Sequence, residues 1–358
     1  MRVPGFVDLQ VNGYLGVSFS DANLTHSSFA NACRRILDDG GCAMILPTVI
    51  TSPHQTYEHV LPLIADVIEN SSDYGISRGR LLGIHMEGPF ISAEDGARGC
   101  HPRDAVLPRA EVSLLGKYQQ LARGCLRLIT IAAEVDGVEH FCRAAKQIGV
   151  VVSLGHQVAG ASDIDRAASA GAALLTHLGN GMPSSIHRHS NPLWPAMAND
   201  SLSAMLITDG QHLPPHAIAA IIRAKGVERC IVTSDCAPVA GLPDGEYEAL
   251  GGRVSVEGEH VRSADRQYLA GSGALMLTCV NHLASLTFSP RPGGPAGLSL
   301  QDLEEMAFYN PLRALGEDPE AVLEAWASRP RLLSCDRGSL PGRLRFFQTP
   351  PDPTLTTL

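Results

Sequence analysis

Short apolar, β-branched segments recur along this chain of 358 residues, and helical stretches separate most of them. Each segment is too short for a helix and lacks the alternation of a half-exposed strand, which is typical of parallel strands buried on both faces. The eight predicted strands cover residues 6–11, 43–50, 80–88, 126–134, 150–156, 173–179, 202–210 and 229–235.

Eight strand-then-helix units are the signature of a closed (β/α)8 barrel, which is the α/β fold we predict. The alternative is an open doubly wound sheet, but the turn "NGYLGVS" after the first strand is not a dinucleotide-binding glycine loop. We expect the barrel to occupy residues 1–290. It includes a stretch broken by Gly and Pro at 241–270 and a helix at about 273–286. Residues 291–358 should add two helices, one short strand and a tail.

Composition and charge exclude several classes of function. Apolar residues make up 44% of the chain, so a large core is expected. A net charge of −9 argues against nucleic acid or an anionic membrane as partner. The sequence has no secretory leader and no membrane-spanning apolar run, and its nine scattered cysteines are typical of reduced thiols. We therefore expect a cytoplasmic protein.

Polar side chains stand where seven of the eight predicted strands end, the position of catalytic groups in such barrels. In chain order these residues are Gln10 and Asn12, Glu87, Glu134, His156, His177 with Asn180, Asp209 with His212, and Asp235.

Two of these histidines, with one carboxylate, form a candidate metal site. His156 and His177 end consecutive strands, and their separation of 21 residues is one βα unit. Their imidazoles should therefore lie side by side, and Glu87 could complete a His2Glu site with a fourth position open for water, as in catalytic zinc sites. The alternative is a purely structural polar cluster.

The carboxylate of Asp235 and the small number of lysines refine the prediction of a metal site. Asp235 could take a proton from a metal-bound water and return it to a leaving amine, although it could also be only an N-cap. The three lysines, Lys117, Lys146 and Lys225, all lie in predicted helical segments, so none can bridge two metals at a strand end. With Gln10 and Asn12 as poor ligands, one divalent ion per chain is expected, with zinc first and iron, manganese or cobalt as alternatives.

An ordered series of motifs resembles N-acetylglucosamine-6-phosphate deacetylases of the amidohydrolase superfamily, whose barrels are of the metal-dependent hydrolase kind. The motifs are "HMEGPFIS…GARGCHP", "SLGHQVA", "LLTHLGNGMP…HR", "ITDGQHLPP", "VTSDCAP" and "LAGSGALM". The resemblance implies that Glu87, His156 and His177 bind one metal and that Asp235 is the general base and acid. It further implies that members with Gln-x-Asn in place of His-x-His use a single metal.

The resemblance also implies how substrate is held. His101 would orient the amino sugar, while Asn180, Arg188 and His212 would hold its phosphate. Arg188 would reach into the site of a neighbouring subunit, so a homodimer or higher homo-oligomer is expected. Gln10 and Asn12 would then shape the pocket.

Three departures from the family bear on the substrate rather than on the chemistry. The small β-sandwich domain that usually accompanies the barrel is expected to be absent or vestigial. Residues 178–182, "LGNGM", lack the family's aromatic side chain, and residues 188–192, "RHSNP", replace its Arg-Glu-Pro-Gly. Two alternatives therefore stay open: an amidohydrolase for another N-acyl or cyclic amide substrate, and a non-catalytic sugar-binding protein.

Overall fold

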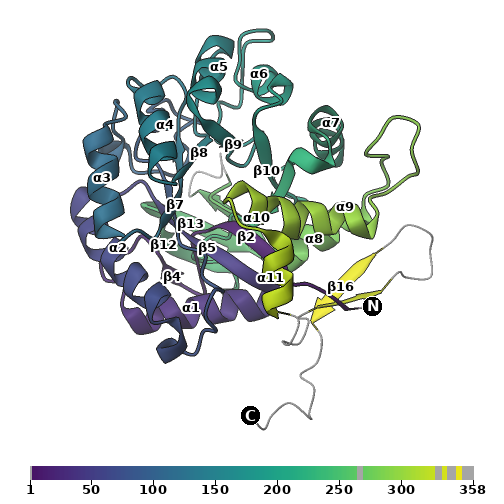
Figure 1. The fold of residues 1–358 in the computed structure, drawn as a ribbon, viewed down its shortest axis with the longest axis horizontal. Helices are drawn as coiled ribbons and strands as arrows, with labels where there is room; N and C mark the ends of the chain where they lie inside the picture. The colour runs from purple at the N-terminus through teal and green to yellow at the C-terminus, as the bar shows by residue number, and fades with distance from the viewer. Residues whose placement is uncertain (1, 264–268, 327–332, 337–343, 349–358) are drawn as a thin grey trace.

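A sheet of eight parallel strands forms the centre of the computed structural model, which describes residues 2–263, 269–326, 333–336 and 344–348 (Figure 1). Each strand pairs with the next of the eight along the chain. Every predicted strand is present, with its ends adjusted by a few residues. The strands are β2 Phe6–Val11, β5 Cys42–Ile50, β6 Ile84–Glu87, β7 Leu126–Ile131, β8 Val151–Leu154, β9 Ala172–Leu175, β10 Ser203–Ile207 and β11 Cys230–Thr233.

A helix follows each of these strands and covers the outside of the sheet (Figure 1). The connection after β9 is irregular, because its helix has only six residues and follows a long loop. The helices are α1 His26–Asp39, α2 His54–Glu69, α3 Val112–Leu121, α4 Val138–Gln147, α5 Ala161–Ala170, α6 Leu193–Ala198, α7 Pro215–Lys225 and α8 Met276–Ser285. Short 3-10 turns are η1 Ser71–Tyr74, η2 Arg103–Ala105 and η3 Val227–Arg229.

The sheet closes where the first strand meets the last. The amide of Asp235 donates to the Gln10 carbonyl at 3.0 Å, and the amide of Asn12 donates to the Cys236 carbonyl at 2.9 Å. Every residue of β2 is buried, so this seam lies inside the protein. These contacts confirm the predicted (β/α)8 barrel and exclude the open doubly wound sheet.

Asp8 adds side-chain hydrogen bonds to the same seam and is itself 1% exposed. Its carboxylate accepts from the Thr233 hydroxyl at 2.7 Å, from the Ser234 amide at 3.1 Å, and from the Ser234 hydroxyl. Burial raises the pKa of Asp8, while these hydrogen bonds act in the opposite direction. A buried carboxyl group with this many donors joins the two ends of the barrel sheet.

The helices after the barrel seal its amino-terminal end. They are α9 Leu300–Glu304, a π-helical turn at Glu305–Tyr309, α10 Asn310–Ala314 and α11 Pro319–Trp326. The side-chain amide of Asn310 donates to two carbonyls at the start of β11, at 2.8 and 2.9 Å. Phe308, Leu312 and Leu315 share a hydrophobic cluster with barrel residues such as Val7 and Leu9. These helices therefore pack on the barrel core, and the division at residue 290 stays a prediction.

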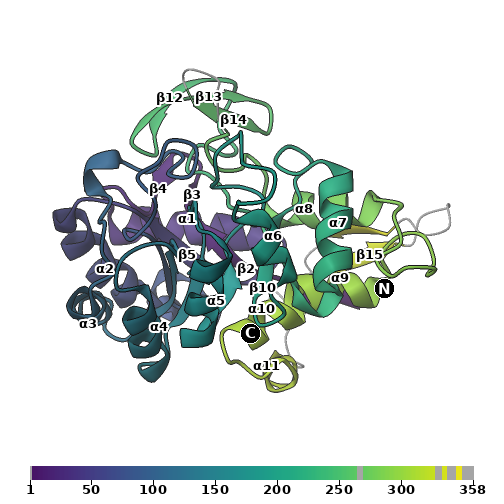
Figure 2. The same cartoon turned by 90° about the horizontal axis from the view of Figure 1, so that it is seen from above.

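A small antiparallel sheet covers the other end of the barrel (Figure 2). It consists of β12 Gly245–Ala249, β13 Gly252–Glu257 and β14 His260–Ser263. The sequence pattern indicated only a broken stretch here. The strands form because Val254 and Val256, two residues apart, bury their side chains on one face, and Gly251 and Gly258 supply turns at φ +78° and +61°.

A second small sheet joins residues from both ends of the chain, in the order β1–β15–β16. Its strands are β1 Arg2–Val3, β15 Leu333–Asp336 and β16 Arg345–Gln348. The predicted terminal strand is confirmed as β16, whereas β1 and β15 were not predicted; the predicted tail lies outside the described residues. A two-stranded hairpin, β3 Gly13–Tyr14 and β4 Val17–Ser18, completes the fold. Within the described part of the chain, no helix has both the length and the apolar character needed to cross a membrane.

Replacing Asp8 should show how much the seam contributes to stability. We expect Asp8→Ala to lower the free energy of unfolding by about 2–4 kcal/mol, because it leaves buried hydroxyl and amide donors without an acceptor. Denaturant unfolding would measure the change. The matched control is Asp21→Ala, an exposed carboxylate that accepts from the Asn23 amide, for which less than about 1 kcal/mol is expected. Equal losses in both variants would contradict a special role for the seam.

Candidate active site

A cavity of about 390 Å³ opens at the carboxyl-terminal ends of the barrel strands. Candidate residues from six different strand ends meet in it, which is the arrangement expected of a barrel active site. Leu250 and Leu269, which flank the small β12–β14 sheet, also line it. Its polar lining consists of Asn12, Glu87, His101, His156, His177, Asn180, Ser184, His212 and Asp235.

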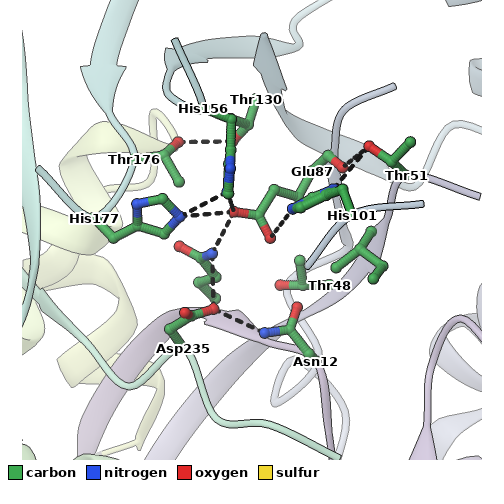
Figure 3. A network of polar contacts seen from close by, with 12 residues as sticks. Asn12, Thr48, Thr51, Glu87, His101, Thr130, His156, Thr176, His177 and Asp235 are labelled. Carbon is green, nitrogen blue, oxygen red and sulfur yellow. Dashed lines mark hydrogen bonds and ion pairs between the residues drawn. The ribbon is translucent and has the colours of Figure 1, made fainter. Parts of the chain in front are cut away.

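Three buried side chains converge on one point, as predicted for the metal site (Figure 3). One oxygen of Glu87, Oε1, lies 3.0 Å from Nε2 of His156 and 3.0 Å from Nε2 of His177, and the two Nε2 atoms are also 3.0 Å apart. Ligand atoms this close together can all face a single ion. The donor set of two imidazoles and one carboxylate suits zinc and other first-row divalent metals.

Contacts behind these ligands favour metal binding. The Nδ1 of His156 lies 2.8 Å from the Ala97 carbonyl, which can only accept, so Nδ1 carries the proton and Nε2 presents a lone pair to the site. Although burial alone would raise it, the neighbouring imidazoles of His156 and His177 hold the pKa of Glu87 well below its usual range. The carboxylate is therefore ionised, as a metal ligand must be.

The backbone at this site is strained. His156, His177 and Asp235 have φ angles of +51°, +30° and +50°, a region that side chains other than glycine rarely adopt. In addition, a Cβ on Gly181 would lie 2.9 Å from His177 and 3.1 Å from His156. The strand ends therefore hold the two imidazoles close together at a cost in conformational energy, which is common at functional sites.

Gln10 and Asn12 contact Asp235, which the sequence did not predict. The Nε2 of Gln10 donates to Oε1 of Glu87 at 2.8 Å and to Oδ1 of Asp235 at 2.9 Å, while the Nδ2 of Asn12 donates to the same Oδ1 at 2.8 Å (Figure 3). One amide group thus uses both of its hydrogens to join two carboxylates. Burial and the nearby charge of Glu87 raise the pKa of Asp235 to about 6.

His101 lies beside the three-residue cluster. Its ring packs edge-on to His156, with centroids 4.3 Å apart, and its Nε2 is 3.9 Å from Glu87. The hydroxyl of Thr51 holds the other nitrogen, Nδ1, at 2.8 Å. Burial lowers the pKa of His101 to about 3, so the ring is neutral at physiological pH.

Asn180 and His212 also line the cavity, on the loops that follow β9 and β10. The side-chain amide of Asn180 donates to the His177 carbonyl at 3.2 Å. The Nδ1 of His212 lies 2.8 Å from Asp209, which is 5% exposed and stands behind the cavity wall.

Arg188 is not brought to the cavity within one chain. It lies in an exposed loop, and its carbonyl accepts from the indole of Trp194 at 2.8 Å. The unusual "HSNP" segment still orders this loop, because Asn191 caps α6 and donates to the His187 carbonyl. Glu134 also stands apart: it lines a neighbouring open cavity and accepts from the Val158 amide.

Sequence reasoning missed Thr51 and Ser272 and assigned no role to Asp209. Only the last had a local signal, since it precedes His212 by three residues in "DGQH", a spacing that suits a side-chain-capped turn. Thr51 and Ser272 contact partners 50 and 63 residues away, so no local pattern could identify them.

Comparisons with known proteins agree with this geometry. No protein-family model matches the chain. The N-acetylglucosamine-6-phosphate deacetylase of Bos taurus is 35% identical over 326 residues, which cover 87% of this chain and 74% of that protein. The N-acetylgalactosamine-6-phosphate deacetylase of Shewanella sp. (strain ANA-3) is 33% identical over 287 residues, which cover 79% of this chain and 68% of that protein.

Solved structures show the same likeness. A mutant N-acetyl-D-glucosamine-6-phosphate deacetylase from Mycobacterium smegmatis, in complex with N-acetyl-D-glucosamine-6-phosphate, superposes with a TM-score of 0.78 at 27% identity. The match covers 88% of this chain and 78% of that one.

The convergence of Glu87, His156 and His177 predicts one tightly bound divalent ion per chain. Either His156→Ala or His177→Ala should remove it, because a three-ligand site cannot spare an imidazole. Elemental analysis of the purified proteins would measure the content. The control is His59→Ala, which removes a histidine whose Nε2 lies 2.8 Å from the Leu24 carbonyl, outside the three-residue cluster. Two ions per chain, or unchanged metal in both site variants, would contradict this assignment.

Proposed function

The chain belongs to the family of N-acetylglucosamine-6-phosphate deacetylases, and on that premise we propose that it hydrolyses the N-acetyl group of an amino-sugar phosphate. The products would be acetate and the free amine. The observation that carries the proposal is the meeting of two imidazoles and two carboxylates at one cavity.

The proposed cofactor is one divalent ion held by Glu87, His156 and His177, with zinc as the first choice. When bound, such an ion polarises an acyl carbonyl and lowers the pKa of water towards about 7. Because Nε2 of His156 presents a lone pair and Glu87 is ionised, these two side chains need no rearrangement of protons to act as ligands.

Asp235 is the proposed general base and acid. Its carboxylate would take the proton of the attacking water and then give it to the amide nitrogen, so that the C–N bond breaks with a neutral amine leaving. Gln10 and Asn12 both donate to Oδ1. They would therefore fix the orientation of the carboxylate and leave Oδ2 to carry the proton. A pKa near 6 suits a group that must both accept and release a proton.

Substrate would lie across the remaining cavity wall. His101, close to Glu87, is placed to contact the acyl group, and Asn180 and His212 would hold the sugar phosphate. The apolar side chains of Leu250 and Leu269 cover the same cavity and would exclude water from the reacting bond.

Two stereoisomeric sugars are candidate substrates, since relatives of this chain are deacetylases of N-acetylglucosamine 6-phosphate or of N-acetylgalactosamine 6-phosphate. Gly179 and Gly181 leave one part of the cavity wall without side chains. This observation keeps hydrolysis of another N-acyl substrate as the second candidate. A non-catalytic sugar-binding role would not require a carboxylate oriented by two amides.

Release of acetate from a panel of amino sugars tests the function directly. The panel contains N-acetylglucosamine and N-acetylgalactosamine, each with and without a 6-phosphate. We expect the highest kcat/KM for a phosphorylated member. Absence of acetate release from all four, with metal bound, would contradict the proposal.

We further propose that Arg188 serves a neighbouring copy of the chain. On either side of it lie two exposed apolar side chains, Ile186 (38% exposed) and Trp194 (51% exposed). Its loop therefore carries apolar surface suited to a homo-oligomeric contact. The cavity of one chain has no Lys or Arg among the described residues that line it. An arginine from a second copy would supply the planar, two-donor grip that phosphate favours.

Asp235→Asn should keep fold and metal but lose the proton carrier. We expect kcat to fall about 10²–10⁴-fold, the usual contribution of general acid–base catalysis. Steady-state rates would be measured with metal content checked in the same preparation. Asp136→Asn, an exposed carboxylate paired with Arg109, should retain full activity. A nearly active Asp235→Asn enzyme would mean that another group moves the proton.

Arg188→Ala should weaken binding of phosphorylated substrate by roughly 2 kcal/mol or more, because a charged hydrogen-bonding partner is removed. The loss should nearly vanish for the same sugar without phosphate. The matched control is Arg143→Ala, an exposed arginine paired with Glu139 on α4. Equal losses on both substrates would indicate a structural role for Arg188.

A further inference from the structure

Asp209, at the end of β10, makes more contacts than a simple turn requires. Its Oδ1 accepts from the amides of Gln211 and His212 at 2.8 and 3.0 Å. Its Oδ2 accepts from Nδ1 of His212 at 2.8 Å and from the hydroxyl of Ser272 at 2.9 Å. The side chain of Asp209 is 1% exposed, and its ion-pair partner among the described residues is His212.

These contacts determine the proton arrangement of His212. A carboxylate can only accept, so Nδ1 of His212 carries a proton, and Nε2 is the ring nitrogen left for a ligand. Although burial alone would raise it, the hydrogen bond and charge of His212 hold the pKa of Asp209 well below its usual range. The buried carboxylate is therefore a permanent negative charge beside the ring.

The charged groups that line the cavity show why the Asp209–His212 pair is important. The described residues lining the cavity include the acidic groups Glu87 and Asp235 but no Lys or Arg. His156 and His177 face the candidate metal, and burial keeps His101 neutral. Among the described lining residues, His212 is thus the one histidine paired with a carboxylate outside the metal cluster, and the best placed to meet an anion.

Ser272 fixes Asp209 in place and connects it to the catalytic side of the cavity. Its hydroxyl donates to Asp209 and accepts from the Ala274 amide at 3.0 Å. Its own amide donates to the Asp235 carbonyl at 2.9 Å, and its carbonyl accepts from Ala237 at 2.8 Å. The serine is 1% exposed, so these bonds are shielded from water. One residue therefore fixes both Asp209 and the backbone of Asp235.

We propose that Asp209, held by Ser272, is a positioning residue that orients His212, the ring with which the cavity recognises the phosphate of the substrate. The inference rests on the proposed function for its substrate class. It adds that discrimination between phosphorylated and plain sugars depends on a buried carboxylate that does not touch the ligand.

The test measures binding separately from catalysis. Glucosamine 6-phosphate and glucosamine carry no acetyl group to hydrolyse, so calorimetric titration of each into the metal-loaded enzyme reports affinity alone. We expect Asp209→Asn, which keeps the shape but removes the charge, to weaken binding of glucosamine 6-phosphate about 10-fold or more. Binding of glucosamine should change less than about 2-fold, and KM rather than kcat should rise for the acetylated phosphosugar.

A double-mutant cycle shows whether Asp209 acts through His212. His212→Gln should reproduce the selective loss, and Asp209→Asn combined with His212→Gln should lose little more than either alone. Ser272→Ala, which removes the hydroxyl that donates to Asp209 but no charge, should give a smaller loss in the same direction and serves if Asp209→Asn folds poorly. Asp302→Asn is the matched control, because that buried carboxylate accepts from Ser299 at the start of α9, pairs with Arg291, and does not line the cavity.

Three results would overturn the inference: equal losses for the phosphorylated and plain sugars, additive losses in the double variant, or a wild-type enzyme with no preference for the phosphorylated sugar. Failure of the proposed function is a separate result. If the wild type releases no acetate but binds glucosamine 6-phosphate preferentially, and Asp209→Asn abolishes that preference, the role of Asp209 stands while the deacetylase proposal fails.

Discussion

Pairing of the first barrel strand with the last is the constraint on which the candidate site depends. The amide of Asp235 donates to the Gln10 carbonyl, and the Asn12 amide donates to Cys236. This register brings two side-chain amides, one at the end of β2 and one just beyond it, to within 2.9 Å of a carboxylate that lies more than 220 residues away. Asp8 strengthens the same seam through Thr233 and Ser234. A shift of one residue would turn the amides away from Asp235.

The electrostatics of the cavity follow from that closure. Two buried carboxylates, Glu87 and Asp235, lie close enough to share the amide of Gln10, and their pKa values are displaced in opposite directions. The histidines keep Glu87 ionised, whereas burial and the charge of Glu87 favour the protonated form of Asp235. Opposite shifts in neighbouring acids are a recurrent way of dividing a ligand or charge-stabilising role from a proton-transfer role.

Three histidines of the cavity each have a supporting partner behind the cavity wall. Thr51 holds His101, the Ala97 carbonyl holds His156, and Asp209 holds His212. These partners fix ring orientations and proton positions before any ligand arrives, which lowers the cost of binding and reaction. The positive φ angles at His156, His177 and Asp235 show that the backbone, too, is held in an unfavourable conformation for the sake of this arrangement.

The sequence by itself determined the barrel and the identity of the residues around its mouth. Burial on both faces leaves a local, readable pattern of apolar runs, and a polar residue ending such a run marks the catalytic face. The 21-residue separation of His156 and His177 was therefore sufficient to place them side by side. The stretch at 241–270 resisted prediction because its strands pair with one another over a small, half-exposed surface. Strand β15 was not predicted because its partner β1 lies more than 300 residues away in the sequence.

Only the tertiary structure decided how these side chains act on one another. Local periodicity does not show that Gln10 and Asn12 donate to Asp235. Nor does it show that Ser272 joins Asp209 to the Asp235 backbone, or that Arg188 lies outside its own chain's cavity. Hydrogen-bond direction and distance depend on the closure of the barrel and on loops far apart in the chain. Periodicity encodes which residues are buried, whereas closure determines which of the buried polar groups meet.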